Sequence, residues 1–199
     1  MKIVGFAGKA GSGKDTLADF LQEIDPSLSR YAFAQPIKDM LLAGLGLAPS
    51  EYDDRSKKEA IIPGLGFSYR RAAQTLGTEW GRSLNADLWL ELAKQEAESL
   101  SNARGKGLII TDVRFPNEAQ WIRSAGGTVV HVIRPEAVTP DNPGHASEAG
   151  LTVEAADWTI FNDQDLAALE ASAEMIYENL IRCSFIYETC NEPSRRKLS

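Results

Sequence analysis

Apolar residues follow two patterns along the chain, short continuous runs and longer runs with helical spacing. The continuous runs, each short enough for a buried strand, lie at residues 2–7, 29–34, 107–111, 128–133 and 158–161. Between them, spacings of three to four predict helices over residues 15–24, 69–82, 87–103 and 116–125, with a further helix starting at Pro36. Strands that alternate with helices predict an α/β fold, a three-layer arrangement in which helices cover both faces of a parallel sheet.

Other segments lack these patterns. Residues 46–68 mix Gly, Pro, Asp, Lys and Glu, so we expect an insert over about 44–68 with a short charged helix at 52–60. Residues 134–156 contain three prolines and are the natural candidate for a lid. Asn162 or Asp163 can cap a last helix that runs to about Cys183, before a tail over about 184–199. With no repeat, residues 1–199 predict a single domain.

Composition excludes some classes of protein. The 199 residues carry a net charge of −7, which argues against a general binder of nucleic-acid polymers. A few clustered arginines can still form a positive pocket for a small anion. No apolar run approaches the roughly 18 residues of a membrane span, and the N-terminus is too short and glycine-rich for a signal peptide. Cys183 and Cys190 fit no common zinc spacing, so we expect reduced thiols and a cytoplasmic protein.

A glycine-rich loop follows the first predicted strand and precedes a helix. Its sequence, GKAGSGKDT at residues 8–16, is typical of a phosphate-binding loop (P-loop). Backbone N–H groups of such a loop converge on phosphate oxygens, the helix directs its positive end at them, and Lys14 adds a charge for the β- and γ-phosphates. We therefore expect the phosphates of a nucleoside triphosphate, ATP, to be bound by Gly11, Ser12, Gly13, Lys14, Asp15 and Thr16.

The residue after the lysine departs from the common pattern, in which Ser or Thr binds Mg²⁺ at this position. Here Asp15 occupies it and Thr16 follows. Asp15 can contact Mg²⁺ through water, or it can be an acid that the helix dipole favours at the first turn.

A second acid stands at the end of another predicted strand, in LIITDVRFPNEA. Carboxyl ends of parallel strands meet at one edge of the sheet, so Asp112 should face the phosphate loop and help to hold Mg²⁺ or its waters. Arg114 can reach the same crevice as a phosphate ligand. Glu118 lies one turn further and either joins the site or simply pairs with an arginine.

Cations for a second anion come from the predicted helix over residues 69–82. Its sequence offers Arg70, Arg71, Gln74, Thr78 and Arg82. Arg70, Gln74 and Thr78 recur at intervals of four and share one face, as a binding surface would, although adjacent arginines are also common on solvated helices. Lys38 is a further candidate cation or a surface lysine, and Trp89 can stack on the substrate or pack in the core.

The segments GKAGSGKDT, FAQPIKDM, YRRAAQTLGTEWGR, ITDVRFPNEA, HASE and FND together resemble phage-type deoxynucleoside monophosphate kinases. The resemblance implies a P-loop kinase with a helical NMP-binding insert and a lid, which transfers the γ-phosphate of ATP to a deoxynucleoside 5′-monophosphate with Mg²⁺. It implies a monophosphate site formed by Arg70, Arg71, Gln74, Gly77, Thr78 and Trp89, with Asp112, Arg114 and Glu118 at its floor. It also implies a phage or prophage origin, hence the bacterial cytoplasm, and it makes a homodimer possible.

Two alternatives stay open. A kinase on the same fold could act on phosphomevalonate or a coenzyme precursor, and a nucleotide-dependent switch could hydrolyse ATP slowly. The apparent second anion site argues against a switch. The accepted bases, the discrimination between ribose and deoxyribose, and the role of His145 are not determined by these patterns.

Overall fold

The computed structural model describes residues 2–46, 55–102, 107–135 and 150–182. Their centre is a parallel sheet of five strands in the order β2-β3-β1-β4-β5. The strands are β1 (Lys2–Ala7), β2 (Leu28–Tyr31), β3 (Gly107–Val113), β4 (Thr128–Ile133) and β5 (Trp158–Phe161). Pairing is parallel between all neighbours, which confirms the predicted α/β class.

Strands β1, β4 and β5 have the predicted bounds, whereas β2 and β3 differ from them. The predicted strand over 29–34 ends at Tyr31, and the backbone N–H groups of Phe33 and Ala34, two and three residues further on, donate to the Asp112 carboxylate instead of to a strand partner. Strand β3 continues past Thr111 to Val113, which pairs with Ala7 after a register shift in β1. Asp112, near the end of β3, thus contacts the turn that follows β2.

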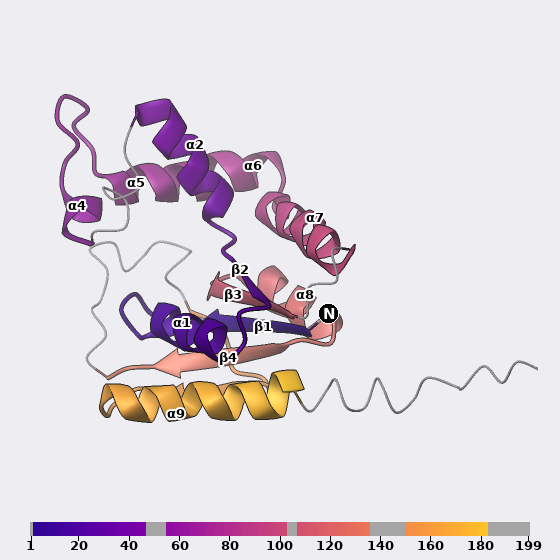
Figure 1. The fold of residues 1–199 in the computed structure, drawn as a ribbon. Helices are drawn as coiled ribbons and strands as arrows, with labels where there is room; N and C mark the ends of the chain where they lie inside the picture. Colours follow the sequence, from indigo (N-terminus) through magenta and orange to yellow (C-terminus); the bar gives the residue numbers. More distant parts are fainter. Residues whose placement is uncertain (1, 47–54, 103–106, 136–149, 183–199) are drawn as a thin grey trace, which may run out of the picture.

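Helices cover both faces of the sheet (Figure 1). On one face α1 (Lys14–Ile24) and α9 (Leu166–Ile176) pack on a core that includes Phe6, Ile109 and Val130. On the other face α7 (Leu88–Asn102) and α8 (Pro116–Ser124) pack on a core that includes Ile3, Ile110 and Val129. No helix within the described ranges is long and apolar enough to cross a membrane.

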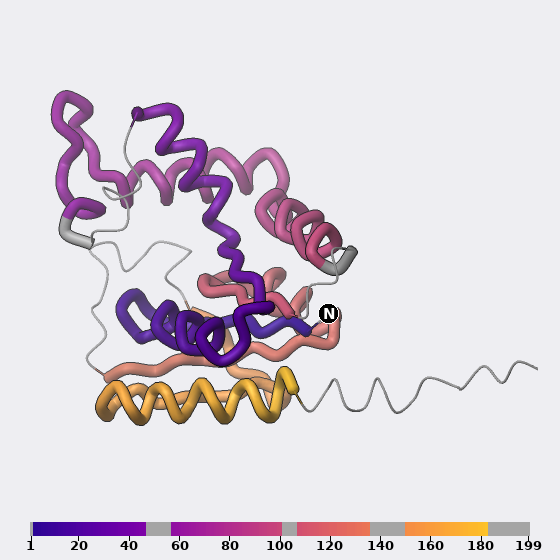
Figure 2. The backbone as a smooth tube through the Cα atoms, viewed as in Figure 1, coloured from indigo at the N-terminus to yellow at the C-terminus, as the bar shows by residue number. Residues whose placement is uncertain are grey.

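The remaining helices form a layer set apart from α1 and α9 in Figures 1 and 2. They are α2 (Gln35–Leu45), α4 (Arg55–Glu59), α5 (Tyr69–Gln74), the π-helix η1 (Thr75–Gly81) and α6 (Arg82–Leu84). The helix predicted over 69–82 is thus interrupted by a π segment. Within it the Gly77 carbonyl accepts a hydrogen bond from the Trp89 indole, and that ring fills the space where Gly81 would carry a Cβ.

The predicted cap of the last helix was wrong. Asp165 caps α9 by accepting from the Ala168 N–H, and the helix continues as the π-helix η3 (Tyr177–Arg182), near the predicted end. Asn162 has a contact with the phosphate loop instead. Helix α4 lies within the charged helix predicted at 52–60. Three stretches lie outside the described residues: part of the insert (47–54), most of the expected lid with His145 (136–149), and the tail with both cysteines (183–199).

Candidate active site

A cavity of about 890 Å³ lies between the phosphate loop, the end of β3 and the helices α2, α4 and α5. Segments that are far apart in the chain therefore share one pocket. Of the predicted site residues, those that line it are Gly11, Lys14, Asp15, Lys38, Arg70, Gln74, Gly77, Thr78, Arg82, Trp89, Asp112, Arg114 and Glu118. Ser12, Gly13, Thr16 and Arg71 are not among the lining residues.

The phosphate loop is held by its glycines and by Lys14. Gly8 has a φ of 148° and lies so close to β4 that a Cβ would stand 2.4 Å from the Val132 carbonyl oxygen, so only glycine fits. The Lys14 Nζ donates to the carbonyl oxygens of Gly8 and Lys9, both at 2.8 Å. The ammonium group therefore lies over the loop, where an anion would meet it.

Asp15 forms an ion pair with Arg30 of β2. Arg30 also forms an ion pair with Asp19, with a distance of 2.6 Å between Nη1 of Arg30 and Oδ1 of Asp19. Both Asp15 and Arg30 line the pocket, and the Asp15 side chain is 75% exposed. The carboxylate is therefore open to solvent and can approach a hydrated ion only in competition with Arg30.

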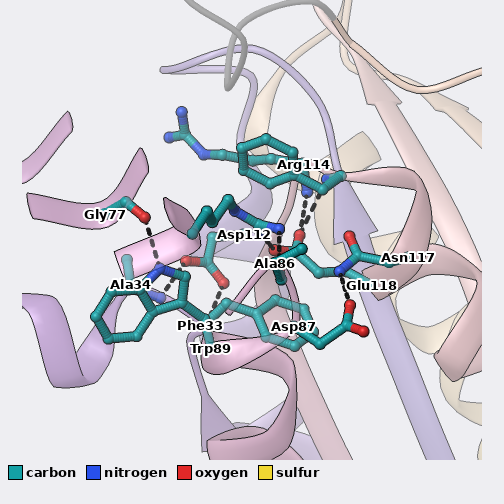
Figure 3. A network of polar contacts seen from close by, with 12 residues as sticks. Phe33, Ala34, Gly77, Ala86, Asp87, Trp89, Asp112, Arg114, Asn117 and Glu118 are labelled. Carbon is teal, nitrogen blue, oxygen red and sulfur yellow. Dashed lines mark hydrogen bonds and ion pairs between the residues drawn. The ribbon is translucent and has the colours of Figure 1, made fainter. Parts of the chain in front are cut away.

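Asp112 holds the turn that follows β2. One carboxylate oxygen accepts from the Phe33 N–H at 2.8 Å and the other from the Ala34 N–H at 2.9 Å (Figure 3). Burial raises the pKa of Asp112, while the Ala34 N–H and the nearby Arg114 charge act to lower it. Each oxygen keeps a further lone pair, so the carboxylate can still accept from a ligand in the pocket.

Glu118 is buried and joins three groups. Its Oε2 accepts from the N–H groups of Arg114 and Phe115 at 2.9 and 3.0 Å, and its Oε1 lies 2.5 Å from Nη2 of Arg82 (Figure 3). The Arg82 guanidinium also stacks 3.5 Å above the Phe115 ring. Of the two roles considered, the pairing with an arginine is present, and Glu118 positions the β3–α8 loop as a capping residue of α8.

Burial raises the pKa of Glu118 to about 7 from an ordinary 4.5, so the folded chain binds more protons than the unfolded chain between these values. The contribution of Glu118 to the free energy of unfolding is complete below pH 4.5 and is lost as the pH rises to about 7. We expect the free energy of unfolding of the wild type, relative to Glu118→Gln, to fall by about 3 kcal/mol across that range. Urea unfolding of both proteins at several pH values measures it; parallel pH curves would contradict the expectation.

The predicted helix face of Arg70, Gln74 and Thr78 lies in the pocket, whereas the adjacent Arg71 does not. Gly77 lines the pocket as well, and Arg70 pairs with Glu59 of α4. Arg71 is exposed and lies outside, because adjacent residues on a helix point in directions about 100° apart.

Two polar groups on this side of the pocket differ in their bonding. The buried Gln74 Nε2 has no hydrogen-bond partner in the part of the chain that the structure describes, as expected of a donor that meets a ligand. Trp89 is 3% exposed and its indole N–H donates to the Gly77 carbonyl at 2.7 Å, so most of the side chain is packed in the core.

Sequence reasoning missed three residues. Arg30 and Lys58 add positive charge to the pocket lining, and Asn162 contacts the phosphate loop. Lys58 belongs to the charged helix of the insert, so its charge was a signal that could have been used. Arg30 carries no local signal, and Asn162 was predicted only as a helix cap, because the roles of both depend on which segments the fold brings together.

Comparisons with known proteins agree with this geometry. Deoxynucleoside-5′-monophosphate kinase of Escherichia phage T5 is 27% identical over 75% of this chain and 84% of its own length. Deoxynucleotide monophosphate kinase of Enterobacteria phage T4 is 25% identical over 85% of this chain and 95% of its own. The crystal structure of TT1252 from Thermus thermophilus has the same fold, with a TM-score of 0.51, 21% identity and coverage of 90% of this chain and 97% of that one.

The family model of deoxynucleotide monophosphate kinases matches residues 52–173. That range spans more than half of the chain and includes the arginine-bearing helix and the acid at the end of β3. With a parallel sheet, a phosphate loop and a second set of cations at one pocket, the chain is a kinase, and it belongs to the deoxynucleotide monophosphate kinase family.

Proposed function

We propose that the chain transfers the γ-phosphate of ATP to deoxynucleoside 5′-monophosphates and releases ADP and the diphosphate. One observation carries the proposal: Lys14 of the phosphate loop and a second set of cations, Arg70 and Arg114, line the same cavity. Transfer between two anions needs positive charge on both sides of the reacting phosphoryl group, whereas a hydrolytic switch needs it on one side only.

At the donor end, residues Gly11 to Thr16 hold the ATP phosphates through backbone N–H groups and the Lys14 ammonium. Asp112 and, through water, Asp15 are suited to hold Mg²⁺, because both are carboxylates of the pocket lining. No three His, Cys, Asp or Glu side chains among the described residues form a metal cage, which fits an ion that takes most of its ligands from phosphates and water. Bound Mg²⁺ would neutralise charge on the β- and γ-phosphates.

At the acceptor end, Arg70, Arg114 and Lys38 face the monophosphate, and Gln74 and Thr78 offer hydrogen bonds to the rest of the nucleotide. Gly77 and Trp89 form the wall behind it, and Glu118 holds the Arg114 backbone. The acceptor phosphate is itself a sufficient nucleophile, so the chain positions two anions in line and needs no general base.

An assay of ADP release across the common nucleoside monophosphates tests this function. We expect ADP release to depend on a deoxynucleoside monophosphate. ATP hydrolysis that no acceptor stimulates would favour a switch, and activity on phosphomevalonate alone would favour the other kinase.

Arg70 and Arg71 form a matched pair for testing the acceptor site, since they are adjacent and only Arg70 lines the pocket. We expect Arg70→Ala to raise the KM for the monophosphate about tenfold or more, as loss of a charged hydrogen bond would. Arg71→Ala should change it less than about twofold, because surface substitutions have small effects. Steady-state kinetics with varied acceptor measures both values; equal effects would remove Arg70 from the site.

The proposal also covers the organisation of the chain. In this proposal residues 1–199 form one kinase domain. The insert over about 44–68 and a lid over about 134–156 close on the bound nucleotides. Action on free nucleotides in the host cytoplasm, without nucleic-acid polymer or membrane, follows from this substrate class. Light scattering of the purified chain measures its mass and tests the homodimer that the family resemblance makes possible.

A further inference from the structure

Asn162 lies directly after β5 and contacts the phosphate loop, from which 150 positions of the chain separate it. Its Nδ2 donates to the carbonyl oxygen of Ser12 at 2.9 Å. Its own backbone N–H donates to the Ile133 carbonyl at 2.8 Å, so the end of β4 holds the residue in place. The side chain therefore links the loop to the edge of the sheet.

The contact constrains one peptide group of the loop. Ser12 is 1% exposed, so its carbonyl needs a partner inside the protein, and Asn162 supplies it. The described chain has no cis peptide bonds, and across a trans peptide the carbonyl and the following N–H point in opposite directions. With the Ser12 carbonyl directed at Asn162, the Gly13 N–H points away from Asn162, and it has no hydrogen-bond partner among the described residues.

Gly13 is shaped to this contact. Its φ of 102° lies in the region that favours glycine, and a Cβ there would stand 2.5 Å from Nδ2 of Asn162. The asparagine thus occupies the space that a side chain at Gly13 would need, and the two residues fit one another.

We propose that Asn162 is a positioning residue for the donor nucleotide, which holds the Ser12–Gly13 peptide so that the Gly13 N–H is presented to a phosphate oxygen. The inference rests on the proposed function, because it assigns the loop to ATP. An amide suits the position because it donates to the carbonyl without bringing negative charge toward the phosphates. Aspartate has nearly the same shape, but it cannot donate when ionised and would repel both the Ser12 carbonyl and the nucleotide.

Three variants test this role: Asn162→Ala, Asn162→Asp and the control Asn179→Ala. Asn179 makes the same kind of bond, from Nδ2 to the Met175 carbonyl at 2.8 Å, but on an exposed part of η3. We expect Asn162→Ala to raise the KM for ATP and the Kd for ADP about tenfold, and Asn162→Asp about a hundredfold. The KM for the monophosphate should stay within about twofold in both, and Asn179→Ala should match the wild type in all three constants.

Calorimetry of ADP binding, together with thermal melting, distinguishes a positioning role of Asn162 from a role in stability alone. A role in stability alone would lower the melting temperature of both Asn162 variants and leave the Kd for ADP of the folded protein unchanged, which would overturn the inference. Wild-type kinase activity with equal constants in Asn162→Ala and Asn179→Ala would also overturn it while leaving the proposed function standing. A wild type that neither binds ADP nor phosphorylates a nucleotide would overturn both.

Discussion

Lys14→Met should lower turnover by roughly 10³-fold or more while the fold stays intact, because it removes the charge that meets the β- and γ-phosphates. Methionine keeps most of the unbranched apolar stem of lysine, so the start of α1 can pack as before. Loss of the hydrogen bonds to the Gly8 and Lys9 carbonyls lowers the stability of the fold. This loss is offset in part because the side chain, which is 9% exposed, no longer carries a charge that is costly to bury.

Steady-state ADP release measures the loss of turnover, and circular dichroism melting measures the stability of the fold. Lys94→Met is the matched control, because Lys94 lies on α7 outside the pocket lining and pairs with Glu91 in the same helix, at 2.7 Å. We expect the control to keep wild-type turnover. Near-normal turnover of Lys14→Met would remove the phosphate loop from the chemistry.

Asp112→Asn should lower kcat by roughly 10²-fold and also lower the free energy of unfolding by about 1–3 kcal/mol. Each oxygen of Asp112 accepts one N–H, from Phe33 and from Ala34, and an amide can accept only one of these because its NH₂ group faces the other donor. The substitution therefore displaces the turn after β2. It also removes negative charge from the place proposed for Mg²⁺.

Dependence of the rate on Mg²⁺ concentration separates these two effects. We expect Asp112→Asn to need more Mg²⁺ for half-maximal rate than the wild type does. Asp165→Asn is the control, since Asp165 accepts the Ala168 N–H at the start of α9 and asparagine caps helices equally well. An unchanged Mg²⁺ requirement, with only stability lost, would limit Asp112 to holding the turn.

Local patterns were sufficient for much of the fold. The apolar runs at 2–7, 128–133 and 158–161 predicted three strands with their observed bounds: β1 and β4 are buried inner strands, and β5 is an edge strand that pairs with β4. Prediction was poorer where a side chain elsewhere replaced a backbone partner. The Asp112 carboxylate accepts from the Ala34 N–H beyond the end of β2, and the Trp89 indole accompanies the π segment between α5 and α6.

The site divides in the same way. Most residues assigned from motifs line the pocket, because the carboxyl ends of parallel strands meet at one edge of the sheet and bring Lys14 and Asp112 to the same cavity. Which of two adjacent arginines faces that cavity depended on the rotation of α5, and only the packed helix selects Arg70 over Arg71. The role of Glu118 likewise depended on finding Arg82 beside it, 36 positions away in the chain.

By itself, the sequence determined that this chain has a phosphate loop on a parallel α/β sheet, because glycine conformations, helix dipole and lysine charge act within a few neighbouring residues. Only the tertiary structure decided how that loop is supported. The bond from Asn162 to Ser12 spans 150 positions, and it forms because strands β4 and β5 end beside the loop. Contacts of this kind depend on distances in space that the packed core sets, and no spacing along the chain encodes them.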